Sequence, residues 1–428
     1  MRIVILAIGS QGDVRPFSAL GAGLARAGHT VRFATHDHFR AHVESLGLEY
    51  APVRLNPMQI VQGETGQAWL ASMDKPLKFM ASISRLAGEV LDSVNDDAWA
   101  ACQGCDAIIY SLPLSVSGYT MADVLGVPGI PAALYPLHAT WAFPSIMTPQ
   151  LPLKGRAMNA LSAHLVIQVF WQVFRSHQNR WLKTRQGRRG LPLNPPLAAF
   201  RRKGVPLLYG YSPSIIPVPQ DWHETYKVCG YWFPPPQAGW VPPAAISRFL
   251  EEGPAPLYVG FGSMASADPA RMTGIVLDAL KATGHRAILA SGWGGLQGEA
   301  LPQSVLQVQS VPHEWLFPRV AAAVHHGGAG TTAAALRAGI PSVVVTFFAD
   351  QFFWGNRLNE IGAGSRPLAQ KRLTAESLAE AIRSVTDSPD VRSRCQDLAS
   401  RIAGEDGVGA AVAAVDHYLG AMMRRMTQ

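Results

Sequence analysis

The sequence predicts an α/β protein built from two doubly wound domains in tandem. Apolar runs of strand length alternate with segments of helix length, and the alternation begins anew in the second half of the chain. A chain of 428 residues is too long for one ordinary core and suits two domains of about 200 residues each. Hydrophobic residues make up 48% and charged residues 16%, a balance that suits a well-buried core and argues against disorder.

The first half shows the order of elements that gives parallel strands with helical crossovers. Its predicted strands are Arg2–Ile8, Thr30–Ala34, Ala107–Tyr110 and Gly129–Ala133. Its predicted helices are Phe17–Ala27, which ends at Gly28, His38–Leu46, which ends at Gly47, and Ser117–Leu125.

The same rhythm restarts at Pro256. Its predicted strands are Leu257–Phe261, Arg286–Ala290, Val305–Gln309, Ala321–His325 and Ser342–Val345. Its predicted helices are Pro269–Thr283, Gly330–Ala338 and Ala375–Thr386. Between the halves, Tyr211–Pro243 is rich in proline and aromatic residues and has no clear period. We therefore expect an N-terminal domain over 1–220, a connector over 221–243, a C-terminal domain over 244–405, and a terminal helix over 406–428 that can pack back on the first domain.

The start of the chain and its cysteines bear on where the protein works. A strand begins at Arg2, without the charged and apolar regions of a secretory signal, and no uninterrupted apolar run reaches the ~18 residues of a membrane span. Cys102 and Cys105 have the CxxC spacing, but no second pair or histidine pair completes a zinc site. We expect a cytoplasmic protein, with peripheral membrane contact as an open alternative, and an incidental cysteine pair.

The net charge of +7 is unevenly distributed. Between Asp123 and Asp221 there is no acidic residue. The basic residues of this stretch are Lys154, Arg156, Arg175, Arg180, Lys183, Arg185, Arg188, Arg189, Arg201, Arg202 and Lys203. Such local basicity indicates one anionic partner surface, and no nucleic-acid-reading motif accompanies it.

A glycine-rich segment, His325-His326-Gly327-Gly328-Ala329-Gly330-Thr331-Thr332, follows a predicted strand and opens a predicted helix. Glycines let the backbone approach a ligand closely, and a helix start offers free N–H groups, so a diphosphate fits there. The alternative is a tight strand–helix turn with Thr331 near the cap.

A second loop at the same end of the sheet carries Asp350 and Gln351, directly after Phe347-Phe348-Ala349. A carboxylate beside an amide suits neighbouring sugar hydroxyls, because the carboxylate only accepts hydrogen bonds while the amide also donates them. The alternative is that Asp350 caps a helix.

The segment from His325 to Gln351, with Ala338-Gly339-Ile340-Pro341, resembles the donor signature of the large nucleotide-sugar glycosyltransferase family 1, which has the GT-B fold. The resemblance is closest to sterol and glycolipid glucosyltransferases and to glycopeptide-antibiotic glycosyltransferases. It covers nearly the whole chain, through Gly9–Pro16, Tyr211–Pro213, Asp221-Trp222 and Gly260–Met264. It implies two Rossmann-like domains that face each other across a cleft, the first binding the acceptor and the second the nucleotide sugar.

The resemblance assigns roles to individual residues. Those implied for the diphosphate are Ser263, His326, Gly328, Gly330, Thr331 and Thr332. The backbone near Val311 and His313 is implied for the base, and Asp350 with Gln351 for the transferred sugar. Plant members of the family carry a ribose-binding glutamate where this chain has Ala334. The sterol-type branch also lacks that glutamate.

Asp13 follows the first strand and lies at a predicted helix start, in a loop with Ser10, Gln11 and Gly12 that we place on the acceptor side. Family members carry histidine or aspartate at this position as the base that deprotonates the acceptor hydroxyl. The alternative is an N-cap aspartate. Because the helix start and His326 would stabilise the leaving diphosphate, we predict catalysis without a metal or cofactor.

The acceptor side also includes a predicted helix over Ala157–Arg175, which is mostly apolar. Its narrow polar stripe consists of His164, Gln168, Gln172 and Arg175. Phe170, Trp171 and Phe174 supply bulk, and Trp141 is placed near the acceptor. With the basic cluster, this helix is either an interfacial segment on anionic lipid or a buried wall of the acceptor pocket.

The predicted function is inverting transfer of a sugar, glucose from UDP-glucose, to a hydroxyl of an apolar acceptor such as a sterol, a lipid or another hydrophobic natural product. Two alternatives stay open. One is transfer of a TDP-linked deoxysugar to a polyketide or peptide antibiotic, and the other is a nucleotide-sugar-binding protein without turnover.

Overall fold

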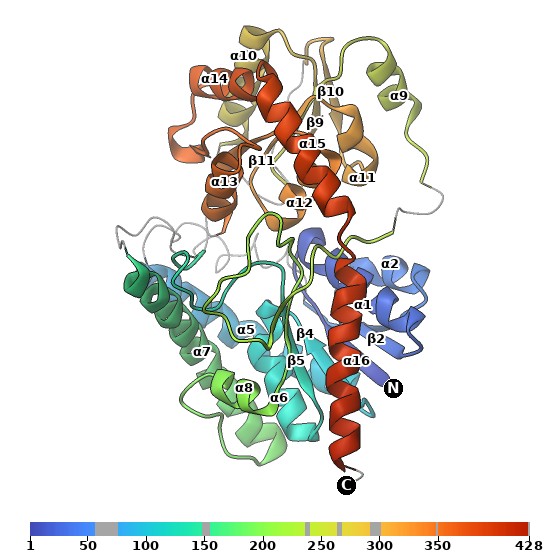
Figure 1. Cartoon of the computed structure of the whole chain (residues 1–428), viewed down its shortest axis with the longest axis vertical. Helices are drawn as coiled ribbons and strands as arrows, with labels where there is room; N and C mark the ends of the chain where they lie inside the picture. Colours follow the sequence, from blue (N-terminus) through green and yellow to red (C-terminus); the bar gives the residue numbers. More distant parts are fainter. Residues whose placement is uncertain are drawn as a thin grey trace.

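The computed structural model describes residues 1–55, 76–147, 155–235, 240–262, 268–291, 301–347 and 350–426. Within these residues the chain forms two α/β domains, one above the other along the long axis of the molecule (Figure 1). Each sheet is built by one half of the chain, so the domains follow one another in sequence as predicted.

The first sheet is parallel throughout. Its strands are β1 (Arg2–Leu6), β2 (Thr30–Thr35), β3 (Glu49–Pro52), β4 (Ala107–Tyr110), β5 (Gly129–Ala133), β6 (Leu207–Tyr209) and β7 (Tyr226–Val228). They lie in the order β3-β2-β1-β4-β5-β6-β7. The strand order reverses between β1 and β4, and in open parallel sheets ligands bind beyond the carboxyl ends of the strands at such a switch point.

Helices cover both faces of this sheet, as parallel strands require. They are α1 (Gln11–Arg26), η1 (Asp37–Phe39), α2 (Arg40–Ser45), α5 (Pro76–Cys102), η2 (Leu112–Leu114), α6 (Ser115–Leu125), α7 (Arg156–Gln186) and α8 (Leu197–Lys203). α1 buries Phe17 and Leu20 against one face. α5, α6 and α7 cover the other, where Met121 and Trp181 are buried.

The second sheet is also parallel. Its strands are β8 (Leu257–Gly260), β9 (Ala287–Ala290), β10 (Val305–Val308), β11 (Ala322–His325), β12 (Ser342–Thr346) and β13 (Leu368–Ala369), in the order β10-β9-β8-β11-β12-β13. Its helices are α9 (Ala244–Glu251), α10 (Pro269–Thr283), α11 (His313–Leu316), η3 (Phe317–Arg319), α12 (Ala329–Ala338), α13 (Gln351–Glu360), η4 (Gln370–Arg372), α14 (Ala375–Thr386) and α15 (Pro389–Ala403). α10 and α14 pack together on one face of this sheet.

The last helix, α16 (Gly407–Met426), lies along α1 of the N-terminal domain (Figure 1). Ala411, Val415 and Leu419 join the core under α1. Where the chain passes from α15 to α16, the Glu405 carboxylate accepts hydrogen bonds from the hydroxyls of Ser212 and Ser214, at 2.6 and 2.8 Å. The passage from α15 to α16 is therefore bonded to the segment between β6 and β7 of the N-terminal domain.

Most predicted strands and helices are present, and the differences have local causes. α1 begins at Gln11 rather than Phe17, because Ser10 and Asp13 form a capping box that starts the helix before Pro16. α7 continues past Arg175 to Gln186. β7 lies inside the stretch 221–243 predicted as connector, since a three-residue strand gives no recognisable sequence period.

Candidate functional site

Asp13 lies in the first turn of α1, and its carboxylate is partly committed to the fold. The backbone N–H and the hydroxyl of Ser10 both donate to its Oδ2, each at 2.8 Å. Gly9, at φ +131°, is needed here, because a Cβ on it would lie 2.5 Å from that oxygen. Within the described part of the chain, Oδ1 of Asp13 accepts no hydrogen bond. Capping and a reactive role are thus compatible, one for each oxygen.

The pKa of Asp13 is raised by burial, and the two bonds from Ser10 offset part of that effect. A raised pKa makes the carboxylate a better proton acceptor than an ordinary aspartate, which suits a general base.

His36, at the end of β2, supports this loop and was not predicted from the sequence. The N–H of Gly9 donates to Nε2 of His36 at 3.0 Å, so that nitrogen must be unprotonated. Burial, followed by repulsion from His38, lowers the pKa of His36 to about 4, so the imidazole is neutral near pH 7. Its position directly after a strand is the signal that could have identified it.

The donor candidates surround the start of α12, where Gly328 is the N-cap and supplies no side-chain cap. The first N–H groups of this helix are therefore open to a ligand. His325 is fully buried, and its Nδ1 accepts the N–H of Gly327 at 3.1 Å, which fixes the turn. His325 therefore shapes the loop, and His326 is the histidine for which contact with a ligand stays a prediction.

The His326 imidazole lies against two glycines. A Cβ on Gly328 would lie 2.4 Å from its Nε2, and a Cβ on Gly262 would lie 3.1 Å from its Cε1. Burial lowers the pKa of His326 to about 4, so it is neutral near pH 7 and can donate one N–H. Its Nδ1 is buried and has no partner among the described residues, as is true of the hydroxyl of Thr332. Thr331 is partly exposed.

Asp350 and Gln351 open α13. Asp350 occupies the N-cap position without a side-chain cap bond, so capping does not explain its presence. Gln351 is buried, and its Oε1 accepts the N–H of Phe347 at 2.7 Å, which closes the loop. The amide oxygen of Gln351 is thus used by the protein itself, and the sugar-binding role of the pair stays a prediction.

The two carboxylates come from different domains and influence each other. Burial, and then the charge of Asp13, raise the pKa of Asp350 to about 7. Burial, and then the charges of Asp350 and Asp13, raise the pKa of Tyr135. Tyr135 follows β5 and so lies near both carboxylates. Tyr135 was not predicted from the sequence, although it follows a strand as Asp13 and Asp350 do.

The segment predicted to bind the base commits its side chains to the core. Val311 is buried, and Nε2 of His313 is 3.1 Å from the hydroxyl of Tyr258. The His313 ring stacks on Phe317, with centroids 4.3 Å apart. These two side chains are therefore used within the protein, and a role of this segment in base binding, which the resemblance implies for its backbone, stays a prediction. Ser263, also predicted for the donor, lies outside the described residues.

The two sets of candidates meet where the first turn of α1 faces the first turn of α12, which we call the domain seam. A Cβ on Gly330 would lie 3.1 Å from the Cα of Gly12. An ion pair between Arg15 of α1 and Glu314 of α11, at 3.5 Å, crosses the seam beside them. Ser10 and Gly12 are partly buried there, and Gln11 is exposed.

The aromatic residues predicted on the acceptor side differ in how far they are exposed. Trp141 is 51% exposed. Phe170 is half-buried and packs on Phe174, with ring centroids 4.5 Å apart. Trp171 is only 5% exposed, and its indole N–H donates to the carbonyl of Pro192 at 3.1 Å. The prediction for Trp171 is corrected: its helical phase turns it toward the core, as for Ala163 and Gln178, so it packs the domain interior.

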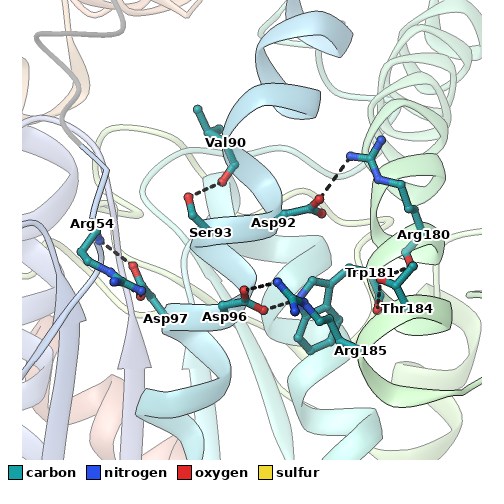
Figure 2. Close-up of polar contacts among 10 residues, drawn as sticks. All are labelled: Arg54, Val90, Asp92, Ser93, Asp96, Asp97, Arg180, Trp181, Thr184 and Arg185. Carbon is teal, nitrogen blue, oxygen red and sulfur yellow. Dashed lines mark hydrogen bonds and ion pairs between the residues drawn. The ribbon is translucent and has the colours of Figure 1, made fainter.

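The basic stretch is partly neutralised by acids that are distant in sequence. Arg180 pairs with Asp92 at 3.6 Å and Arg185 with Asp96 at 3.1 Å, both on α5 (Figure 2). The indole N–H of Trp181 donates to Asp96 at 2.8 Å. The absence of acids between Asp123 and Asp221 therefore does not leave every cation in the stretch unpaired.

Two family models match the chain. "Glycosyltransferase family 28 N-terminal domain" matches residues 3–143, and "Erythromycin biosynthesis protein CIII-like, C-terminal domain" matches residues 275–412. The sterol 3-beta-glucosyltransferase of Aspergillus fumigatus is 35% identical over 97% of this chain. The chain spans 30% of the length of that relative.

Solved structures show the same fold. The glycotransferase of kitacinnamycin has a TM-score of 0.69 at 18% identity, covering 97% of this chain and 98% of that one. A Streptomyces sp. SF2575 glycosyltransferase complexed with thymidine diphosphate has a TM-score of 0.62 at 20% identity, covering 97% and 99%. Together with the two parallel sheets, these findings confirm the predicted membership: the chain belongs to the glycosyltransferases of the GT-B fold.

Proposed function

We propose that this chain transfers glucose from UDP-glucose to a hydroxyl of a sterol or a similar apolar acceptor, with inversion at the anomeric carbon. The observation that carries the proposal is the pair of groups at the domain seam. Asp13, from one domain, has an Oδ1 that accepts no hydrogen bond from any described residue, and the start of α12 with His326 lies in the other domain. The sterol as acceptor is favoured by the likeness to sterol 3-beta-glucosyltransferases over 97% of the chain.

In the proposed step, Oδ1 of Asp13 takes the proton of the acceptor hydroxyl while the oxygen of that hydroxyl attacks the anomeric carbon. The new bond joins that oxygen to the carbon, and the bond from the carbon to the β-phosphate oxygen breaks. The electron pair of the broken bond leaves with the diphosphate. Because attack comes from the face opposite the leaving group, the configuration at this carbon inverts.

The departing charge would be stabilised without a metal. The first N–H groups of α12 carry partial positive charge, and neutral His326 can donate a hydrogen bond to a phosphate oxygen. Asp350 would accept hydrogen bonds from sugar hydroxyls, and both of its oxygens can do so when the group is ionised, at a pH above its pKa of about 7.

A second candidate is transfer of a deoxysugar from a thymidine diphosphate donor to a polyketide or peptide antibiotic. It is favoured by the C-terminal match to the erythromycin biosynthesis model and by the neighbour complexed with thymidine diphosphate. A third is a nucleotide-sugar-binding protein without turnover, against which the presence of Asp13, His326, Asp350 and Gln351 together argues.

One assay separates these candidates. UDP-glucose and TDP-linked deoxysugars are each incubated with sterols, lipids and macrolides, and products are identified by mass spectrometry and the anomeric configuration by NMR. The proposal expects a β-glucoside of a sterol from UDP-glucose. A deoxysugar product from TDP donors alone supports the second candidate, and nucleotide-sugar binding without any product supports the third.

A further inference from the structure

One face of α7 exposes apolar side chains. Leu161, Leu165 and Val169 are 45%, 55% and 42% exposed. Their spacing of four residues aligns them along the helix. The opposite face is buried in the core of the N-terminal domain through Ala163, Trp171 and others.

The exposed face continues at both ends of this row. The side-chain amide of Asn159 donates to the carbonyl of Trp141 at 3.0 Å, which places Trp141 beside the first turn of α7. The side chains of Gln168 and Gln172 donate to the carbonyl of Leu193, at 3.3 and 2.5 Å, and Leu193 is 65% exposed.

We call this set the apolar ridge, and it consists of Trp141, Leu161, Leu165, Val169 and Leu193. It holds five of the ten large hydrophobic side chains that are exposed in the described residues, so exposed apolar surface is concentrated here. Soluble monomers rarely expose a contiguous apolar patch without a partner for it.

The polar stripe of α7 is used internally. Gln168 and Gln172 hold Leu193, and Nε of Arg175 donates to the carbonyls of Leu191 and Pro192, at 3.0 and 2.9 Å. The stripe thus fixes the segment that returns along α7 after the helix ends, and it presents Leu193 beside the row.

One cation contacts the ridge, and other unpaired cations follow it in the chain. The guanidinium of Arg156 lies over the ring of Trp141, 5.1 Å from its centroid. Lys183, Arg189, Arg202 and Lys203 are exposed and have no ion-pair or hydrogen-bond partner among the described residues. Arg185, in contrast, is held by Asp96, so it does not contribute a free charge. The carboxylate of Asp221 also lies beside Trp141, whose backbone N–H it accepts at 2.8 Å, so this end of the ridge carries an acid as well as Arg156.

By length and composition, α7 is the one described helix that could cross a membrane. Only 17% of its most apolar window is buried in the protein, so it is not a core helix. α7 packs along α5 and α6. Since that side is committed to the domain, only the ridge is available to lipid, and the helix would lie on a membrane rather than span it.

We propose that the apolar ridge docks this chain on the surface of an anionic lipid bilayer. Aliphatic side chains suit the acyl boundary, a tryptophan suits the headgroup level, and unpaired cations suit anionic headgroups. The loop that carries Trp141 also reaches the second domain, since Phe143 packs on Phe353 of α13 with centroids 5.7 Å apart. α13 begins beside Asp350, so the docked surface adjoins the proposed reaction site. Resting on the proposed function, this arrangement would deliver an apolar acceptor directly from the bilayer.

Cosedimentation of the full chain with vesicles of phosphatidylcholine, with and without phosphatidylglycerol, tests the proposal without donor or acceptor. The parent protein should bind only the anionic vesicles, and salt should weaken binding. The triple variant Leu161→Ser/Leu165→Ser/Val169→Ser should bind at least ~10-fold more weakly. The variant Arg189→Gln/Arg202→Gln/Lys203→Gln should lose roughly fivefold per cation.

Matched controls lie elsewhere on the surface. Val218→Ser/Val241→Ser changes exposed apolar residues, and Lys281→Gln/Arg372→Gln/Arg392→Gln changes exposed cations of the second domain. Both should bind vesicles like the parent. With a detergent-dispersed acceptor, the ridge variants should keep the parent's rate, and with the acceptor in vesicles they should be slower.

Three outcomes would overturn the proposal: no binding of the parent to anionic vesicles at low salt, equal loss in ridge and control variants, or a parent dimer that the ridge variant converts to a monomer. The last would assign the ridge to a second copy of the chain. A protein that binds vesicles but transfers no sugar would overturn the proposed function and leave the docking surface standing.

Discussion

Gly12 of α1 and Gly330 of α12 meet across the domain seam at a distance that makes a side chain on Gly330 a tight fit. A Cβ there would lie 3.1 Å from the Cα of Gly12, whereas a Cβ on Gly12 would lie 3.9 Å from the nearest backbone atoms of Gly330. The first spacing is too tight for ordinary packing and the second is ordinary contact. Glycine at position 330 therefore allows the first turns of α1 and α12 to approach closely, and a methyl group there would push them apart.

Gly330→Ala should therefore lower transfer activity without lowering stability. Alanine favours a helix over glycine by up to about 1 kcal/mol, so a loss of activity would come from the wider seam or from the diphosphate site at the start of α12, and not from unfolding. Gly274→Ala, in α10 of the same domain, is the control, because a Cβ there would meet nothing within 4 Å and the variant should act like the parent. Steady-state kinetics and thermal melts of both variants check this, and equal activity of the two would contradict a tight seam at Gly330.

Asp13→Asn should lower turnover by about 10²- to 10⁴-fold while donor affinity changes little. The asparagine Oδ1 can still accept the bonds from Ser10, so α1 should keep its cap and the protein its melting temperature. Asp37→Asn, an exposed carboxylate elsewhere in the domain, serves as the control. A variant of Asp13 that turns over near the parent rate would remove this residue from the role of base.

His326→Ala should weaken both UDP binding and turnover, because one contact would hold the diphosphate before and after it departs. Loss of a hydrogen bond to a charged group typically costs about 1.5–3 kcal/mol, or roughly 10- to 150-fold. His417→Ala, on the exposed side of α16, is the control. Calorimetry that finds equal UDP affinity in the parent and in His326→Ala would rule out the contact.

Asp350 should make the protein less stable as the pH rises from about 4 to about 7. Its pKa is about 7 in the folded chain, against an ordinary value near 3.8, so the folded state binds more protons in that interval. Asp350→Asn should then raise the melting temperature above pH 7 relative to the parent, and the difference should vanish near pH 4. Melting both proteins across this range without donor checks it, and a difference independent of pH would contradict the raised pKa.

The sequence by itself determined the fold class and the loops that carry the site. Buried parallel strands leave long apolar runs, and glycine punctuates the turns after them, so the two sheets could be recognised locally. Asp13 and Asp350 were predicted as site residues from their positions after strands together with the family resemblance. His36 and Tyr135 follow strands too, but no distinctive spacing singled them out, and only contacts with the Gly9 loop and with Asp350 assign them to the site.

Only the tertiary structure decided how α7 is used. The sequence showed an apolar helix and an acid-free stretch of cations, but pairing depends on side chains far apart in the chain. α5 brings Asp92 and Asp96 against Arg180 and Arg185, which neutralises part of the charge. The face of α7 that carries Trp171 is buried, and the face that carries the ridge is exposed. Which face is buried is decided by the helices and the sheet that pack against α7, and the sequence of α7 alone does not specify it.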